Sequence, residues 1–478
     1  MSNMKINWRE SKLVRRPRRL SWHRTLPLWA LASLLGSYQD ARAIDYVFTR
    51  IADTSGEFSS FSDSGGHGAP AVNEHGVVAF FANLDSGGSG IFTGNGGATT
   101  TIADTSGAFA SFEYEPVMGI FIPASPDINH VGTVVFYAEL DSGEFGIFTG
   151  DGLSTTTIED SSGPHADFGS LPSINSSGAV AYMAVLDGGG EEIIRMDGAE
   201  TTIASTLAGF NSLARIASLN DFGVVAFQGT LNSGVHGVFK GDGGPTMTIA
   251  DDTGAFQFFG EPDFNNAGVA AFWVVLDVPT ETMILKGDGG PTITVADTTD
   301  NFAELYFVSI NNAGTVAYRA RPSGGGSGIY TGPDPVADKV IATDDPLDGL
   351  TVMDVYMSPR GLGEQGQIGF VAKMSDLRTR IYRADPDVDV DGVADPSDNC
   401  PGLANLDQAD SDADGVGDPC DACPGANDVA DANMNGMADC LEPAPAGCCA
   451  PGVFPVMGLF TPMVLLGWRW TRRRSGVH

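Results

Sequence analysis

Basic residues are scarce in this sequence of 478 residues, which has 26 Lys and Arg against 60 Asp and Glu and a formal net charge of −34. A surface of that sign repels phosphate groups, which argues against nucleic acid and anionic membranes as partners. Cysteine is scarce too, since six residues are too few for a disulfide scaffold in a chain of this length. The length leaves room for several domains, at roughly 100–200 residues each.

Catalytic patterns are also missing. No zinc-spaced pair, nucleophile elbow or phosphate loop occurs, and the histidines beyond the N-terminal segment are His67, His75, His130, His165, His236 and His478. His75 and His130 fall in equivalent turns, where we expect hydrogen-bonded or solvent-facing side chains. These observations argue against an enzyme without excluding one.

Glycine, in contrast, is abundant, with 62 residues in 478, or about 13% where about 7% is ordinary. Such a content favours a chain with many turns over a mainly helical one.

The first 43 residues predict an export signal. Arg15, Arg16, Arg18 and Arg19 precede an apolar run from Leu26 to Gly36, and Ala41-Arg42-Ala43 has the small residues of a signal-peptidase site. The run is too short to span a bilayer, which favours cleavage after Ala43. The arginine pairs leave twin-arginine export open beside the general secretory route.

The C-terminal segment 443–478 predicts a sorting signal or an anchor. After Gly447-Cys448-Cys449 comes an apolar run from Val453 to Trp468, followed by an Arg-rich tail that would stay cytoplasmic. This order resembles the tripartite C-terminal sorting signals of Gram-negative-type bacteria, above all the Cys-containing myxobacterial type. The resemblance implies attachment at the surface or release, whereas a plain anchor would keep the helix.

Residues 44–384 contain a repeat that occurs seven times. Its first pattern is Asn-x-x-Gly followed by small and apolar residues and an aromatic, as in Asn73–Gly76 to Phe80. Second and third patterns follow it, exemplified by Gly90-Ile-Phe-Thr-Gly94 and Ile102-Ala-Asp104. Six of the seven first patterns keep both Asn and Gly, and the last begins with Gly363 instead. Periods of about 40–50 residues are typical of propellers and solenoids.

Each repeat has the periodicity of strands. Val78, Phe80, Ala82 and Leu84 alternate with the residues between them, and Asn-x-x-Gly is a turn signal, so we interpret these Asn residues as structural. About 45 residues hold three to four strands, which matches one propeller blade. The third pattern is missing after Tyr382 but occurs alone at Ile51–Asp53. We therefore expect a closed all-β propeller of seven blades, in which the N-terminal strand completes the last blade.

These repeats resemble a family of bacterial surface proteins with tandem Asn-x-x-Gly-x-x-Ala-Phe motifs and a varied choice of C-terminal anchor. The resemblance covers about residues 44–384. It implies an architecture and a surface location, and no activity.

Residues 385–442 predict a calcium-binding segment, with 15 Asp, one Glu and no Lys or Arg. Three stretches of 12 residues place oxygen ligands at positions 1, 3, 5, 9 and 12 and Gly at position 6. The candidate ligands are Asp387, Asp389, Asp391, Asp395 and Asp398 in loop 1; Asp410, Asp412, Asp414, Asp418 and Asp421 in loop 2; and Asp431, Asn433, Asn435, Asp439 and Glu442 in loop 3. A solvated acidic linker is the alternative.

The flanks Asp398-Asn399-Cys400-Pro401 and Cys420-Asp421-Ala422-Cys423-Pro424 resemble thrombospondin type 3 repeats. That resemblance implies a loop-rich calcium-binding stalk with disulfides Cys400–Cys420 and Cys423–Cys440. Export makes such bonds chemically reasonable.

Two functions remain open. The first is an exported monomer at the cell surface (outer membrane) or in the medium, whose propeller head binds an unknown protein or polysaccharide and whose C-terminal segment alone contacts a membrane. The second is an extracellular polysaccharide hydrolase or lyase, which would place unrepeated acids, Tyr or His at the mouth of the channel.

Overall fold

The structure is a computed structural model that describes residues 44–62, 68–117, 120–123, 125–277, 281–428, 430–432, 434 and 437–442. The predicted export signal 1–43 and the predicted sorting segment 443–478 lie outside the described residues. The chain divides between Gln408 and Ala409 into two compact units, which are described separately. None of the helices in the described part of the chain has the length and apolar character needed to cross a bilayer.

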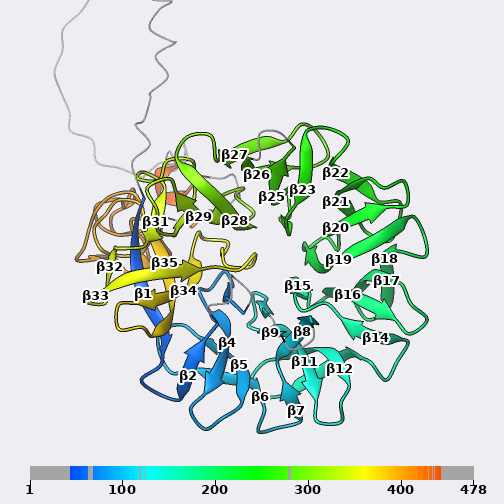
Figure 1. The fold of residues 1–478 in the computed structure, drawn as a ribbon. Coiled ribbons are helices and arrows are strands. Elements are labelled where there is room, and N and C mark those ends of the chain that lie inside the picture. The colour runs from blue at the N-terminus through cyan, green and yellow to red at the C-terminus, as the bar shows by residue number, and fades with distance from the viewer. Residues whose placement is uncertain are drawn as a thin grey trace, which may run out of the picture. The chain divides into compact units, whose positions relative to one another are not determined.

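Seven antiparallel sheets are arranged in a ring around a central axis and form a seven-bladed propeller (Figure 1). Blade 1 consists of β2 (Phe58–Phe61), β3 (Ala71–Val72), β4 (Val78–Leu84), β5 (Ser89–Gly94) and β6 (Thr100–Asp104). Blade 2 consists of β7 (Phe109–Ser111), β10 (Asp127–Ile128), β11 (Val134–Leu140), β12 (Phe145–Gly150) and β13 (Thr155–Asp160). Blade 3 consists of β14 (His165–Phe168), β15 (Ser173–Ile174), β16 (Val180–Leu186), β17 (Glu191–Met196) and β18 (Glu200–Ser205).

The remaining blades repeat this order. Blade 4 consists of β19 (Phe210–Leu219), β20 (Val225–Leu231), β21 (His236–Gly241) and β22 (Met247–Asp251). Blade 5 consists of β23 (Phe256–Phe259), β24 (Asp263–Phe264), β25 (Ala270–Leu276), β26 (Thr282–Gly287) and β27 (Ile293–Asp297). Blade 6 consists of β28 (Phe302–Ile310), β29 (Val316–Pro322), β30 (Gly328–Tyr330) and β31 (Lys339–Ala342). Blade 7 consists of β32 (Pro346–Leu347), β33 (Leu350–Tyr356), β34 (Ile368–Met374), β35 (Thr379–Asp387) and the N-terminal β1 (Asp45–Asp53).

Strand β1 closes the ring, as the sequence predicts. It pairs antiparallel with β35, with Ala52 opposite Ile381 and Asp53 opposite Arg380, and so supplies the outer strand of blade 7. The ladder continues to Asp45 opposite Asp387, beyond the expected propeller boundary at residue 384. Strand β35 extends that far because β1 offers it backbone partners along its whole length.

The alternation of side chains buries both faces of each blade. In β4, Phe80 belongs to a cluster that includes Val371 and Ile381 of blade 7, whereas the adjacent Phe81 belongs to one that includes Phe136 of blade 2. The three phenylalanines are fully shielded from solvent. Each interface between blades is therefore a separate hydrophobic core, and the repeat sequence generates one for every blade.

One unequal spacing of the repeat has a structural cause. A hairpin of β8 (Glu113–Val117) and β9 (Ile120–Pro123) forms a separate two-stranded sheet within repeat 2. This insertion lengthens the interval between Gly76 and Gly132 to 56 residues, against 45 or 46 residues in each of the next four intervals.

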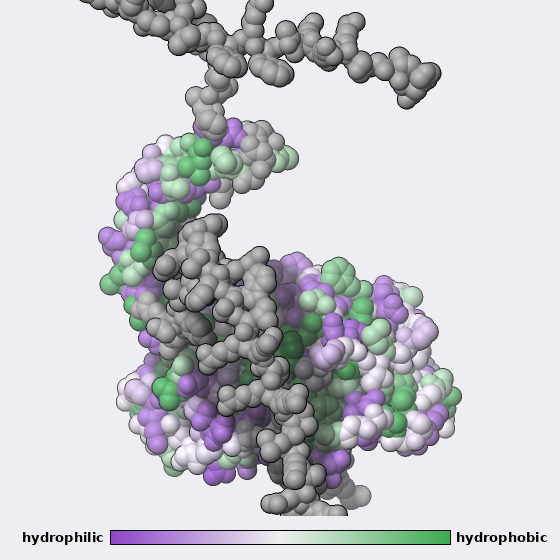
Figure 2. Space-filling model, turned by 90° about the horizontal axis from the view of Figure 1, so that it is seen from above, coloured by the Kyte–Doolittle hydropathy of each residue, from purple (hydrophilic) through white to green (hydrophobic). Residues whose placement is uncertain are grey.

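The surface shows no broad apolar face in the view of Figure 2, where hydrophobic residues are interspersed with hydrophilic and neutral ones among the coloured residues. Exposed large apolar side chains of the propeller are distributed over different blades, as Leu153, Leu207, Phe222, Ile293 and Val336 illustrate. Isolated apolar residues of this kind are normal on a soluble protein.

Candidate functional site

A polar ring surrounds the propeller axis two residues before each repeat motif. The position is occupied by small or acidic residues: Ala71, Asp127, Ser173, Ser218, Asp263, Ser309 and Gly361. Asp127, Ser173, Ser218, Asp263 and Ser309 line the central cavity. Strands β3, β10, β15, β19, β24 and β28 hold six of the seven positions. Because each ring residue comes from a different blade, the ring exists only when the propeller closes.

Arg360 precedes the ring residue Gly361 of blade 7, and its side chain contacts three other blades. Its Nη1 donates to Asp263 Oδ1 at 2.8 Å and to the hydroxyl of Ser218 at 3.2 Å. Its Nη2 donates to the carbonyl of Ala217 at 2.7 Å, and its Nε lies 3.5 Å from Asp127 Oδ2. With a side chain only 9% exposed, Arg360 neutralises a buried acidic centre.

The two acids are held by further hydrogen bonds. Asp127 Oδ2 accepts from Ser173 Oγ at 3.1 Å and from Ile174 N at 3.0 Å, and Asp263 Oδ2 accepts from Ser309 Oγ at 2.9 Å. Burial raises the pKa of the Asp127 carboxyl, although Arg360 acts in the opposite direction. The ring therefore forms a satisfied polar network in the middle of the head.

Little room is left in the channel. The cavity lined by this ring has a volume of about 160 Å³, whereas pockets for small organic ligands measure about 300–1,000 Å³. The channel as it stands suits water or a small ion.

The motif asparagines tie successive blades together. Asn220 Oδ1 accepts from Phe222 N at 3.1 Å and from Val224 N at 3.0 Å, which forms the predicted turn. Its Nδ2 donates to the carbonyl of Asn265 in the next blade at 3.3 Å. The same contact to the next blade is made by Asn73, Asn129, Asn175 and Asn265. The interpretation as structural residues is thus extended: each Asn stabilises its turn and the blade interface.

A second ring of side chains forms the mouth of the channel, one residue after each motif asparagine. Asp221 Oδ1 accepts from Ser176 N at 2.8 Å, Asn266 Oδ1 from Asp221 N at 2.8 Å, and Glu364 Oε2 from Asn312 N at 2.8 Å. Burial, followed by the charges of Asp263, Asp221 and Glu74, raises the pKa of Glu364. His130 lines the same cavity, whereas the side chain of His75 is 64% exposed.

Loop 1 of the acidic segment begins at the last residue of β35. Asp387 Oδ1 accepts from Val390 N at 2.7 Å and its Oδ2 from Gly392 N at 2.9 Å. Val390 has a positive φ of 64°, and Gly392 one of 94°. This fold brings oxygens of Asp387, Asp389 and Asp391 within 4.8 Å of one another. The predicted ligands at positions 1, 3 and 5 therefore converge.

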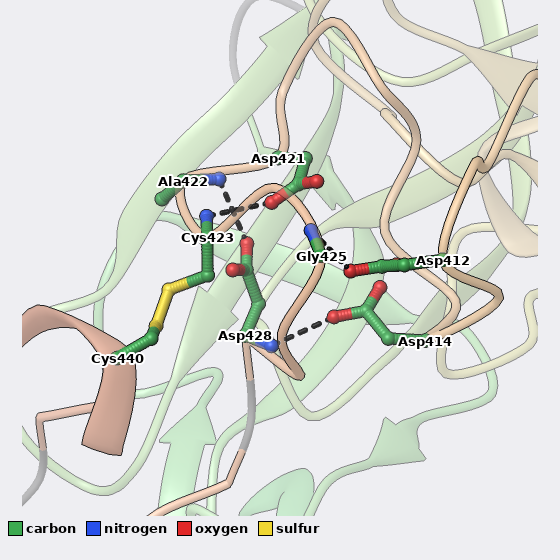
Figure 3. Close-up of a disulfide and its surroundings, with 8 residues drawn as sticks. All are labelled: Asp412, Asp414, Asp421, Ala422, Cys423, Gly425, Asp428 and Cys440. Atoms are coloured by element: carbon green, nitrogen blue, oxygen red, sulfur yellow. Dashed lines mark hydrogen bonds between the residues drawn. A yellow bond between two sulfur atoms is a disulfide. The ribbon is translucent and has the colours of Figure 1, made fainter.

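Loop 2 has the same conformation. Asp410 accepts from Ala413 N at 2.7 Å and from Gly415 N at 3.0 Å, and its carboxylate converges with those of Asp412 and Asp414. Figure 3 shows Asp412 and Asp414 facing the following turn, where Asp412 accepts from Gly425 N and Asp414 accepts from Asp428 N.

Position 9 behaves differently from the first three ligand positions. Asp395, Asp418 and Asp439 each accept the backbone N–H of position 2 in their loop, at 2.9, 2.7 and 3.0 Å. Asp439 with Ala432 shows that loop 3 shares this contact. Asp431 and Glu442 are described, whereas the predicted ligands Asn433 and Asn435 lie outside the described residues.

Several carboxylate oxygens in these loops are buried without a hydrogen-bond partner among the described residues, namely Oδ2 of Asp389, Oδ2 of Asp398 and Oδ1 of Asp412. Asp389 is only 8% exposed. Loss of contact with water and then the charges of Asp391, Asp398 and Asp387 raise its pKa. Buried, like-charged, unpartnered oxygens fit a bound cation, and an all-oxygen set is the kind that Ca²⁺ prefers.

The cysteines of the acidic segment are oxidised. Cys423 and Cys440 form a disulfide with a Cα–Cα distance of 6.0 Å (Figure 3), which confirms that pairing. Cys400 and Cys420 are also disulfide-bonded. In loop 2, Asp421 at position 12 accepts from Cys423 N at 2.6 Å, so the disulfide adjoins a predicted ligand.

Sequence reasoning missed Arg360 and its two acidic partners. A signal was present, because the ring position is small or acidic in every repeat and an arginine precedes Gly361 in the last one. The repeat pattern begins at the asparagine position, which is two residues after the ring position and, in the last repeat, three residues after Arg360.

Comparison with known proteins places the chain in one family and finds solved structures of low sequence identity. A model described as a family of unknown function (DUF7453) matches residues 36–377. No curated protein matches the chain. Among solved structures, an oligogalacturonate lyase in complex with manganese is 9% identical, with a TM-score of 0.46, 71% of this chain covered and 97% of the other. TolB from Acinetobacter baumannii is 16% identical (TM-score 0.34; 53% and 64% covered), and the SapL1 lectin in complex with alpha methyl fucoside is 12% identical (TM-score 0.34; 57% and 93% covered). Such similarity transfers no activity.

Proposed function

The chain belongs to the DUF7453 family, and we propose that it is an exported interaction or adhesion protein with a propeller head and a calcium-stabilised acidic segment. The convergence of Asp387, Asp389 and Asp391, together with the unpartnered Oδ2 of Asp389, carries this proposal. With calcium bound at loops 1 to 3, residues 385–442 would be a stiff thrombospondin type 3-like stalk. Because calcium is abundant outside cells, calcium binding would then determine whether this stalk is ordered.

The proposed localisation is the cell surface or the extracellular medium. The Ala41-Arg42-Ala43 site, the Arg-rich C-terminus and the choice-of-anchor-like repeats support export. The disulfide Cys423–Cys440 agrees with an oxidising compartment. We propose a monomer whose membrane contact is limited to the C-terminal segment.

The ligand would bind on the loops of the head rather than inside it. The central cavity is small, and the side chains of Asp221, Asn266 and Glu364 at its mouth already accept hydrogen bonds from neighbouring backbone N–H groups. The outer loops of different blades differ in sequence, which would allow recognition of a protein or a polysaccharide.

A polysaccharide hydrolase or lyase is the second candidate, and one residue favours it. Burial raises the pKa of Glu261 to about 7, against the influence of Arg360. A carboxyl with a pKa near neutrality can act as a general acid or base.

Binding and cleavage assays separate the two candidates. Residues 44–449 would be tested against panels of acidic and neutral polysaccharides and of extracellular proteins, with calcium and with chelator. Calcium-dependent binding without chain shortening supports the interaction protein. Release of oligosaccharides that is abolished by Glu261→Gln would establish the enzyme instead. Binding that is indifferent to chelator would remove calcium from the proposal.

A further inference from the structure

Blade 3 departs from the repeat at the first residue of β14. In blades 1, 2, 4, 5 and 6 the equivalent residue is a phenylalanine, which lies opposite the end of the neighbouring long strand: Phe58, Phe109, Phe210, Phe256 and Phe302. In blade 3 this residue is His165, opposite Leu186. The imidazole of His165 therefore occupies a position that holds an apolar aromatic side chain in those blades.

A second departure meets the first. The residue after the Ile or Val of the outer strand is alanine in six blades, at Ala52, Ala103, Ala204, Ala250, Ala296 and Ala342. In β13 this residue is Glu159, whose Oε1 lies 2.6 Å from His165 Nδ1. Its Oε2 accepts from the hydroxyl of Tyr182 at 2.5 Å. Two exceptional residues from adjacent blades thus form one contact, and Tyr182 orients it.

This contact fixes the chemistry of the other ring nitrogen. Because the Glu159 carboxylate accepts this hydrogen bond, Nδ1 of His165 is the donor, and Nε2 is the nitrogen left to coordinate a metal. The side chain is only 2% exposed, and Nε2 has no hydrogen-bond partner in the described part of the chain. Leaving such an atom unpaired is costly.

Two carboxylates lie close to this nitrogen. Glu192 Oε2 is 3.9 Å from His165 Nε2, and ligand atoms of His165, Glu192 and Glu200 lie within 4.8 Å of one another. Glu192 replaces the glycine found in four other blades, at Gly90, Gly146, Gly237 and Gly328. A distance of 3.9 Å is too long for a hydrogen bond. Two ligands that share a metal at about 2.1 Å stand about 3–4 Å apart.

We propose that His165, Glu192 and Glu200 bind one divalent transition-metal ion of the zinc type. Imidazole nitrogen with carboxylate oxygens suits such an ion, whereas calcium prefers oxygen alone. Glu159 is a positioning residue, because it holds the imidazole through Nδ1 as carboxylates do behind metal-binding histidines.

The three ligands come from β14, β17 and β18, which belong to blade 3 (Figure 1). Glu200 is exposed, whereas His165 is buried. Three protein ligands leave at least one coordination position on the solvent side for water or an oxygen of an external ligand. This site is independent of the calcium loops and of the channel.

Titration of the full chain with ZnCl₂ in excess CaCl₂, which keeps the acidic loops occupied, tests the site by calorimetry. We expect one tight zinc equivalent, and Co²⁺ in its place should give visible absorption bands. His165→Phe restores the repeat residue and should remove the equivalent. Glu159→Ala should weaken affinity by about 10–100-fold while keeping the stoichiometry. His75→Phe, at an exposed histidine, is the matched control.

Failure to bind Zn²⁺ or Co²⁺ would overturn the proposal, as would an unchanged equivalent in His165→Phe. If that variant does not fold by circular dichroism, Glu192→Gln decides in its place, because it keeps the side-chain volume. Zinc retained at full affinity in Glu192→Gln would also reject the site.

Discussion

Arg360 donates a hydrogen bond to Asp263 across the propeller axis, 2.8 Å long and between residues 97 positions apart in the sequence. Asp127 faces the same guanidinium from another blade. The centre of the ring is therefore held by charge and hydrogen bonds, whereas the blade interfaces are held by apolar side chains.

Replacing Arg360 by methionine should destabilise the head strongly. The change leaves Asp127 and Asp263 buried without their cation, which costs about 3–5 kcal/mol when one partner of a buried pair is removed. Urea unfolding with calcium present measures the loss. Arg321→Met is the control, because Arg321 lies in an exposed pair with Glu304 and should change stability by less than about 1 kcal/mol. Equal effects of the two variants would contradict this account.

The effect of Arg360→Met should also depend on pH. The pKa of Asp127 is raised in the folded protein, so the folded state binds this proton more tightly than the unfolded chain does. Stability from that proton is present below the ordinary Asp pKa of about 4 and is lost as pH rises through the raised value. Arg360 lowers the pKa of Asp127, so its removal raises that pKa further, and the variant gains more stability on acidification than the wild type does. The difference in free energy of unfolding between the two proteins should therefore shrink as the pH falls. A constant difference between pH 4 and 7 would contradict this prediction.

Removing β1 should open the ring. A chain that starts at Thr54 lacks the outer strand of blade 7 and exposes the edge of β35 from Arg380 to Asp387. We expect a lower midpoint of thermal unfolding and a tendency to associate, measured by circular dichroism and size-exclusion chromatography. A chain that starts at Ile44 is the control. Equal midpoints for the two chains would mean that closure contributes nothing.

Asp412→Ala should remove one calcium ion of the set. Alanine removes a converging carboxylate and the acceptor for Gly425 N, whereas Asn would still offer a ligand oxygen at this position. Calorimetry should count one calcium fewer, with the head still folded, and Asp389→Ala should do the same in loop 1. Asp141→Ala, in a turn of blade 2, should leave the count unchanged. No calcium uptake by the wild-type protein would identify the segment as a plain acidic linker.

Asn220→Ala should cost about 1–3 kcal/mol, since two backbone N–H groups and the carbonyl of Asn265 lose their partner. Unfolding in urea measures the change. Asn232→Ala, in an exposed turn of the same blade, provides the comparison. If both variants behave alike, the motif asparagine is only a turn former.

The propeller could be predicted from the sequence because its repeat is regular. The contacts between side chains across the propeller axis could not be predicted in this way. The isolated pattern at Ile51–Asp53 predicted the pairing of β1 with β35, because a missing strand in one place and a spare one in another must match. The role of Arg360 could not be predicted, because its partners become neighbours only when the ring of blades is closed. His165 has no zinc-spaced partner in the sequence, and only its alignment with Phe58 and Phe109 marks it as an exception in the repeat.

Asp387 ends β35 and begins loop 1, so a force applied from the C-terminal side enters the propeller through that strand. Strand β35 is hydrogen-bonded along both edges, to β34 on one side and to β1 on the other. Pulling along its axis would shear both ladders at once instead of unzipping one bond after another. If the C-terminal segment tethers the protein as proposed, closure by the N-terminal strand would give the head mechanical resistance at the point where the tether pulls.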